Sequence, residues 1–180
     1  MIIKPTAVDG AYLIEIEAKT DERGFFARVF DNAIFADRGM ESVVSQCNLS
    51  HSTSRGTLRG LHYQAAPNAE ARFVRCIRGR VFDVVVDVRD NSLTAGQWFT
   101  TELSALNHNG IYAPPGTAHG FLTLEDDSEV LYMASAPYVP ASERGIRWND
   151  PAFAIDWPLP PSVLTEKDGA WPDFSGRLDP

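Results

Sequence analysis

Hydrophobic and β-branched residues recur in short runs along the whole chain, and in several runs they alternate with polar residues. Turn-forming residues separate most of the runs. Many short strands at this spacing are typical of a β-sandwich or barrel. The runs that we expect to form strands are 12–18, 25–30, 43–48, 57–63, 72–78, 81–88, 97–103, 111–113, 119–124 and 129–136.

The run at 81–88, VFDVVVDV, has one wholly apolar face and a second face that carries Asp83 and Asp87. Side chains alternate between the two faces of a strand, so both acids share the face formed by every second residue. Two acids on an otherwise apolar face are unusual, and we interpret them as the lining of a polar cavity. Residues 72–88 together predict a hairpin that turns at Gly79.

Helix signals are few. Asp31 can cap a short helix that runs through Arg38 and ends at Gly39, and a second turn is expected near residues 141–143. From Trp157 the chain becomes rich in proline, which predicts an ordered wrapping tail without strands. With no linker or low-complexity stretch, we expect residues 1–180 to form one all-β domain with a few short helices.

Composition narrows the possible partners. Hydrophobic residues make up 44% and charged residues 22% of the 180, an ordinary balance for a globular domain. The sequence shows neither a membrane span nor signal-peptide features, so we expect a cytoplasmic protein. The net charge of -8 disfavours nucleic-acid and membrane-surface binding. The two cysteines, Cys47 and Cys76, form no disulfide framework, and we expect both to be small buried residues.

The acidic balance does not exclude a phosphorylated small ligand, because a local group of arginines is enough to bind phosphate. The arginines are concentrated in a few segments. They are Arg23 and Arg28, then Arg55 and Arg59, and finally Arg72, Arg75, Arg78 and Arg80. We interpret Arg78 and Arg80, which flank Gly79, as surface charges.

Two segments carry residues suited to chemistry. The first is GTLRGLHYQ, residues 56–64. A core strand seldom carries residues such as Arg59, Gly60 and His62 so close together. A structural histidine beside a surface arginine would explain them equally well. In PPGTAHGFLTL, residues 114–124, the PxGxxH spacing resembles the second half of the cupin signature, which aims His119 into a barrel. The HxH pair of a metal-binding cupin is missing, so we predict no metal site.

Two further features remain ambiguous when they are read alone. Tyr132 and Tyr138 are six residues apart and face the same side if their strand stays regular, but they could also be core aromatics. The acids of TEKD, residues 165–168, lie in the tail, where such groups are usually solvated.

These motifs follow one another in an order that is characteristic of one protein family. DERGFFARVF, GTLRGLHYQ, VRCIRGRVFDVVVDVR, PPGTAHGFLTL, ERGIRWNDP and TEKD make the chain resemble the dTDP-4-dehydrorhamnose 3,5-epimerase family from about residue 21 to 168. The resemblance implies a cupin-like jelly-roll barrel that usually forms a homodimer. It also implies epimerisation of a 4-keto-6-deoxy nucleotide sugar at C3, C5 or both, through an enolate, in dTDP-rhamnose or related deoxysugar biosynthesis. The family uses no metal and no redox cofactor, so the resemblance implies no cofactor here.

The resemblance assigns roles to individual residues. His62 matches the family's base, Asp168 the acid that orients this histidine, and Tyr132 the proton donor on the far face of the sugar. Asp83 and His119 match polar residues of the cavity, and Tyr138 matches an aromatic ring that stacks on the base of the nucleotide. The implied nucleotide contacts are Arg23, Gln46, Asn48, Arg59, His119, Glu143 and Lys167.

Some positions depart from the family pattern around the nucleotide and sugar. Arg28 stands where a glutamate is usual, Cys47 replaces an aspartate, and Arg72 replaces a lysine on the oxyanion or phosphate side. The alternatives are a mono-epimerase acting on another nucleotide-linked keto sugar, a 3,4-ketoisomerase, and a non-catalytic sugar-binding cupin. The retained His62, Tyr132 and Asp168 favour epimerisation over 3,4-ketoisomerisation.

Overall fold

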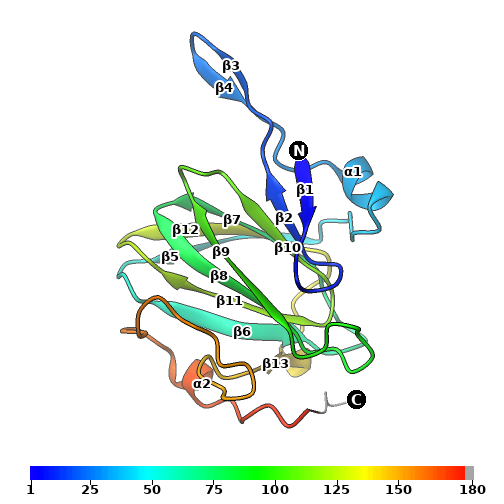
Figure 1. Ribbon diagram of the computed structural model, residues 1–180, viewed down its shortest axis with the longest axis vertical. Helices are drawn as coiled ribbons and strands as arrows, with labels where there is room; N and C mark the ends of the chain where they lie inside the picture. Colours follow the sequence, from blue (N-terminus) through cyan, green and yellow to red (C-terminus); the bar gives the residue numbers. More distant parts are fainter. Residues whose placement is uncertain (177–180) are drawn as a thin grey trace.

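The computed structural model describes residues 1–176, and its main body is built from two antiparallel β-sheets (Figure 1). The six-stranded sheet has the order β1 (Ile2–Pro5), β2 (Tyr12–Glu15), β10 (Gly110–Ala113), β7 (Arg72–Arg78), β12 (Ser128–Ala134) and β5 (Gln46–Ser52). The five-stranded sheet has the order β13 (Glu143–Gly145), β6 (Leu58–Gln64), β11 (Thr117–Thr123), β8 (Arg80–Asp87) and β9 (Trp98–Ser104). The expected all-β, cupin-like fold is confirmed.

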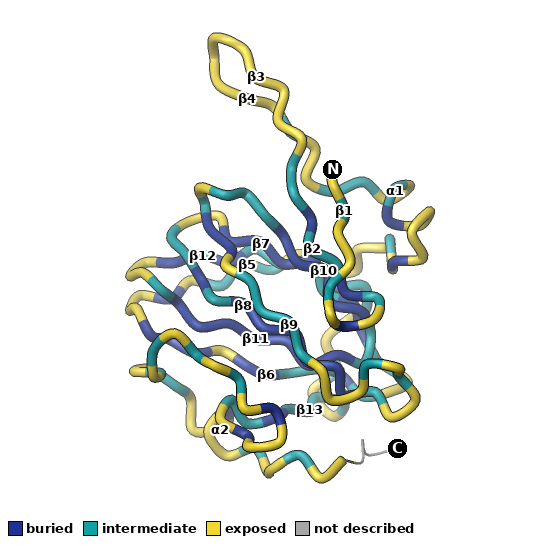
Figure 2. Tube along the Cα trace, viewed as in Figure 1, coloured by how far each residue is buried: buried dark blue, intermediate teal, exposed yellow. Residues whose placement is uncertain are grey.

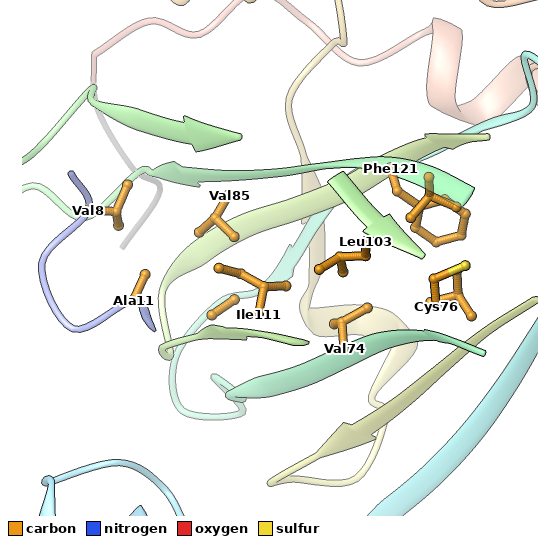
Figure 3. Close-up of a cluster of buried hydrophobic side chains, with 11 residues drawn as sticks. Val8, Ala11, Val74, Cys76, Val85, Leu103, Ile111 and Phe121 are labelled. Atoms are coloured by element: carbon orange, nitrogen blue, oxygen red, sulfur yellow. The ribbon is translucent and has the colours of Figure 1, made fainter. Parts of the chain in front are cut away.

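The main core lies between the two sheets. Inward-pointing side chains form a buried cluster with members on both sheets, from strands β7 to β12 and the loop before β2 (Figure 3). Val74 on β7 and Ile111 on β10 meet Val85 on β8 and Leu103 on β9. This packing fixes the inner faces of the sheets, which also form the cavity described below.

The tail covers the outer face of the five-stranded sheet. Val84 and Val86, on the apolar face of β8, pack in a second buried cluster with Phe153, and the half-buried Trp157 lies against it. The tail itself is mostly irregular and carries many exposed residues (Figure 2). The predicted wrapping tail is therefore confirmed for the described residues, and residues 177–180 lie outside them.

The short helices begin and end largely as the sequence predicts. Helix α1 spans Asn32–Asp37, and the side chain of Asp31 caps it by accepting hydrogen bonds from the backbone N–H groups of Ala33 and Ile34. The 3-10 turn η1 covers Pro140–Ser142. A further helix, α2 (Glu166–Gly169), lies in the tail and is capped by Thr165. No helix among residues 1–176 is long and apolar enough to cross a membrane.

Three expectations are wrong. Strands β7 and β8 do not form a hairpin, because β7 pairs with β10 and β12 while β8 pairs with β11 and β9, so the chain changes sheets at Gly79. The strand expected at 25–30 is limited to β4 (Gly24–Phe26), which pairs with β3 (Lys19–Asp21) in a hairpin that projects from the barrel (Figure 1). Cys47 is exposed, whereas Cys76 is buried.

Candidate active site

A cavity of about 530 Å³ opens between the two sheets, which is an ordinary size for a small-ligand site. Its walls come from β5, β7 and β12 on one side, and from β6 and β11 on the other. The tail closes it through Thr165, Lys167 and Asp168. Of the residues predicted from the sequence, the cavity is lined by Gln46, Asn48, Arg59, His62, Arg72, His119, Tyr132, Tyr138, Glu143, Lys167 and Asp168.

His62 and Asp168 form a close pair in the cavity. The Nε2 of His62 lies 2.6 Å from an oxygen of the Asp168 carboxylate, and the backbone N–H of Gly60 donates to the other oxygen at 3.4 Å. Burial opposes ionisation of Asp168, but the hydrogen bond and charge of His62 outweigh it, so the pKa of Asp168 lies below its usual range. This geometry is the one that an orienting acid requires, and the role itself stays a prediction.

Gly60 explains why the strand can present His62 in this way. A side chain at residue 60 would place its Cβ 2.6 Å from the Cα of Gly120 on the neighbouring strand, and the φ of residue 60 is +124°. Only glycine tolerates both the close approach to Gly120 and the positive φ. The register of β6 and β11 shifts at this point, and the glycine lets the two strands approach closely. His62 lies opposite His119 in this register.

His119 forms a second histidine–aspartate pair. Its Nε2 lies 3.0 Å from both carboxylate oxygens of Asp83, and both side chains are buried. Complete burial raises the pKa of the Asp83 carboxyl, and the nearby imidazole opposes that shift. Asp83 lies behind His119 and does not itself line the cavity. The prediction that Asp83 and Asp87 line a polar cavity is therefore wrong: Asp83 contacts the cavity only through His119, and Asp87 pairs with Arg89 in the loop that follows β8.

Tyr132 lies on the wall opposite His62. It belongs to β12 of the six-stranded sheet, whereas His62 belongs to β6 of the five-stranded sheet, and both line the cavity. The floor between them is apolar, because Val74, Phe121 and Val130 extend there from the main core. A ligand held between these walls would meet an imidazole on one side and a phenol on the other.

The rim of the cavity carries a chain of polar contacts. The Nζ of Lys167 lies 2.8 Å and 2.9 Å from the carboxylate oxygens of Glu143, and the hydroxyl of Tyr138 donates to Glu143 at 2.8 Å. Burial opposes ionisation of Glu143, but these two donors prevail and lower its pKa. The backbone N–H of Tyr138 also donates to the side chain of Gln46. Tyr138 remains 51% exposed, so its ring is available to a ligand.

Two arginines reach the cavity from different strands. Arg59 donates to the hydroxyl of Ser52 and the carbonyl of His51, and the rest of its side chain is exposed. Arg72 donates through Nε to Glu70 at 2.9 Å and through Nη1 to the carbonyl of His62 at 3.0 Å. Arg72 thus contacts the backbone of His62 and forms an ion pair with Glu70.

Within one chain, Arg23 and Arg28 are not brought to the cavity. Arg23 lies at the β3–β4 turn and pairs with Asp21, and Arg28 pairs with Asp31 beside α1. No residue of the hairpin is among those that line the cavity. Among residues 1–176, no three His, Cys, Asp or Glu side chains form a group that could hold a metal ion. The metal-free reaction stays a prediction.

Several residues of the cavity were not predicted from the sequence. The most informative are Ser50, Glu70 and Thr165. The hydroxyl of Ser50 is buried without a hydrogen-bond partner among the described residues, and Glu70 is buried because it pairs with Arg72. Ser50 could have been found from its alternation with Gln46 and Asn48 along β5, since every second residue of a strand faces the same side.

Comparison with known proteins gives a consistent result. The family model for dTDP-4-dehydrorhamnose 3,5-epimerase matches residues 5–176. The dTDP-4-dehydrorhamnose 3,5-epimerase of Methanothermobacter thermautotrophicus is 46% identical over 169 residues, which cover 92% of this chain and 90% of that protein.

Solved structures agree with the sequence match. The crystal structure of dTDP-4-dehydrorhamnose 3,5-epimerase from Elizabethkingia anophelis superposes with a TM-score of 0.93 at 38% identity, covering 97% of this chain and 96% of that one. A 3′-monoepimerase from Streptomyces bikiniensis, in complex with dTDP-quinovose, superposes with a TM-score of 0.86 at 34% identity, covering 94% and 86%. The chain belongs to the dTDP-4-dehydrorhamnose 3,5-epimerase family.

Proposed function

We propose that the protein epimerises a 4-keto-6-deoxy nucleotide sugar at C3, C5 or both, as part of deoxysugar biosynthesis. The observation that carries this proposal is the placement of His62 and Tyr132 on opposite walls of one cavity. Inversion at carbon requires removal of a proton from one face and its return to the other. A base and an acid on opposite walls meet that requirement without any movement of the sugar.

In the proposed reaction, the substrate's ketone acidifies the hydrogens on the neighbouring carbons. His62 accepts one of these protons, and the C–H electron pair moves into the carbonyl to form an enolate. Asp168 stabilises the resulting imidazolium, because its carboxylate lies 2.6 Å from Nε2. Tyr132 then donates its hydroxyl proton to the opposite face of the carbon. The imidazolium of His62 releases its proton to solvent, and solvent returns a proton to Tyr132.

The nucleotide is proposed to lie toward the rim. Arg59 carries the positive charge that suits a diphosphate. The exposed ring of Tyr138 offers a stacking surface, and the side chains of Gln46 and Lys167 are close enough to contact the same ligand. Because stacking tolerates any base, thymidine recognition depends on polar contacts such as that of Gln46.

The direct test is solvent exchange. Incubation with candidate 4-keto nucleotide sugars in deuterated water, followed by NMR, should show deuterium at the inverted carbons. A non-catalytic sugar-binding cupin would bind the sugar, but the sugar would gain no deuterium. That outcome would refute the proposal.

The replacement Tyr132→Phe separates the two halves of the reaction. It keeps the ring but removes the proton donor, while His62 remains. We expect the variant to lose inversion by about 10²-fold or more, while slower deuterium exchange without inversion persists. Full inversion by the variant would exclude Tyr132 as the donor.

The number of inverted carbons is a separate question. The similarity to the Streptomyces bikiniensis 3′-monoepimerase supports a mono-epimerase as the second candidate, because that protein shares the fold at 34% identity. Deuterium at both C3 and C5 would identify a double epimerase, and deuterium at one carbon a mono-epimerase.

We further propose that the protein is a cytoplasmic homodimer of single-domain subunits. Its two free cysteines fit a reducing compartment. The dimer is supported by the outer face of the six-stranded sheet, where Leu49 is 59% and Ile77 45% exposed. Leu131, opposite Leu49, and Met133 continue this apolar surface. A second copy that packs on this face would bury the surface.

The projecting hairpin gives the dimer a functional role. Arg23 has a side chain that is 82% exposed and lies outside its own cavity. We therefore expect the hairpin of one subunit to supply Arg23 to the cavity of the other.

Sedimentation velocity tests the dimer. Leu49→Asp should give monomers, whereas Leu93→Asp, at a 97% exposed position between β8 and β9, should leave the wild-type dimer. Mixing Arg23→Ala and His62→Ala subunits should then restore about a quarter of the wild-type sites, because half of the dimers combine one intact histidine with the partner's arginine. Wild-type protein that sediments as a monomer would exclude the dimer, and mixtures without activity would exclude the exchange of Arg23.

A further inference from the structure

Trp171 lies beside the histidine of the proposed base pair, three positions after Asp168. Its indole meets the imidazole of His62 edge to face, with 6.2 Å between the ring centroids and an interplanar angle of 65°. Trp171 does not line the cavity, so it contacts His62 from outside the substrate space. No family motif quoted above includes this residue.

Gly145 makes room for the indole. In the register of β13 and β6, Gly145 lies directly opposite His62, so a side chain at residue 145 would point to the same side as the imidazole. A Cβ built at Gly145 would lie 2.5 Å from the indole Nε1 of Trp171 and closer still to its Cε2. The ring therefore occupies the place that any side chain at residue 145 would need.

The indole acts through its shape. Its Nε1 is buried and has no hydrogen-bond partner among the described residues. Buried tryptophan N–H groups usually find a partner, so this ring is not held by its polar atom. Instead, the ring fills the space between Gly145 and the imidazole of His62.

The tail has other attachments on both sides of this point. Val163 pairs with Thr57 in an isolated bridge before α2, and after Trp171 the side chains of Phe174 and Phe153 pack together. Arg147 also pairs with Asp173. Loss of the indole should therefore leave the tail bound and alter only the segment between these anchors, where Asp168 lies.

We propose that Trp171 is a positioning residue that wedges between Gly145 and His62, keeps Asp168 within hydrogen-bond distance of the imidazole, and excludes water from that bond. The inference rests on the proposed function only in that the positioned pair serves proton abstraction. Its structural part concerns the His62–Asp168 bond itself and is measurable without any substrate.

Kinetics supply the first test. Trp171→Ala should lower kcat about ten- to a hundredfold, because small displacements of a catalytic group cost that much. The KM should change by less than about threefold, since the nucleotide contacts are untouched. Trp171→Phe, which keeps an aromatic ring without the unpaired N–H, should recover most of kcat. Trp157→Ala is the control: Trp157 is another tail tryptophan, packed on Phe82, and its loss should lower stability without this fall in kcat.

A double-mutant cycle with Gly145 supplies the second test. Gly145→Ala alone should lower kcat, because the new methyl group displaces the indole. In the Trp171→Ala background the same change should cost nothing further, since the space is empty. Additive effects of the two replacements would show that Gly145 and Trp171 act independently, and would overturn the wedge.

NMR of the imidazole proton supplies the third test, and it needs no sugar. The proton shared by His62 and Asp168 should give a far-downfield signal in the wild-type protein that disappears in His62→Ala. The signal should persist in Trp171→Phe and Trp157→Ala, and broaden by exchange in Trp171→Ala and Gly145→Ala. A sharp signal in Trp171→Ala would refute the inference. Absence of deuterium incorporation by the wild type would refute the proposed function and leave this measurement valid.

Discussion

The imidazole of His62 and the carboxylate of Asp168 lie 2.6 Å apart, although 106 positions separate them in the chain. Strand β6 carries the first and the short tail helix α2 the second. Burial alone would favour a protonated Asp168, and the hydrogen bond with His62 reverses that preference. The pair therefore depends on the tail being folded against the barrel.

Removal of either member should stop proton abstraction. We expect His62→Ala to lower the rate of deuterium incorporation by about 10²- to 10⁴-fold, the usual contribution of a general base. Asp168→Asn should lower kcat while preserving nucleotide affinity, because the neutral amide cannot stabilise an imidazolium. His51→Ala is the matched control, since His51 is exposed and pairs with Asp127 outside the cavity. Wild-type exchange in His62→Ala would rule out this base.

Arg59 should contribute strongly to diphosphate binding. Loss of a charge-assisted hydrogen bond costs about 1.5–3 kcal/mol, which corresponds to about a ten- to hundredfold rise in the dissociation constant. Calorimetry with dTDP, UDP, GDP and CDP on Arg59→Ala measures this effect and identifies the preferred base. Arg78→Ala, at an exposed position outside the cavity, should bind like the wild type. If Arg59→Ala keeps the wild-type affinity, the diphosphate lies elsewhere.

Asp87 should stabilise the fold in a pH-dependent way. Despite its burial, hydrogen bonds from Arg89, Ser92 and Thr94 lower the pKa of Asp87 from 3.8 to about 2. A lowered folded-state pKa means that this stabilisation is complete above about pH 5 and is lost as the pH falls toward 2. The shift corresponds to about 2 kcal/mol.

Urea unfolding of Asp87→Asn tests this directly. The variant should be less stable than the wild type by about 2 kcal/mol at pH 7, and the difference should shrink between pH 4 and pH 2. Asp37→Asn, on the exposed part of α1, should differ little from the wild type at any of these values. A difference that does not vary with pH would show that Asp87 acts through packing and not through its charge.

Activity should survive chelation. Enolisation in the proposed mechanism needs a base, an acid and a cation near the developing oxyanion, and His62, Tyr132 and Arg72 can supply these. Treatment with EDTA should therefore leave the rate of deuterium incorporation unchanged. Loss of activity that one added divalent metal restores would contradict the metal-free mechanism.

The sequence by itself predicted most of the β-structure, because alternation and turn residues are local signals. It also predicted the cap of α1 at Asp31. The motif order identified eleven residues that line the cavity, including His62, Tyr132 and Asp168. These predictions succeeded because a strand's periodicity or a family motif is written in neighbouring residues.

The tertiary structure alone decided which strands pair and which distant groups meet. The switch between sheets at Gly79 follows from the different partners of β7 and β8, which no local pattern shows. The exposure of Cys47 and the projection of Arg23 away from its own cavity follow from which surfaces the rest of the chain covers. The place of Trp171 beside His62 needs both the register of β13 on β6 and the path of the tail. Such contacts join residues far apart in the chain, so they form only once the whole barrel has packed.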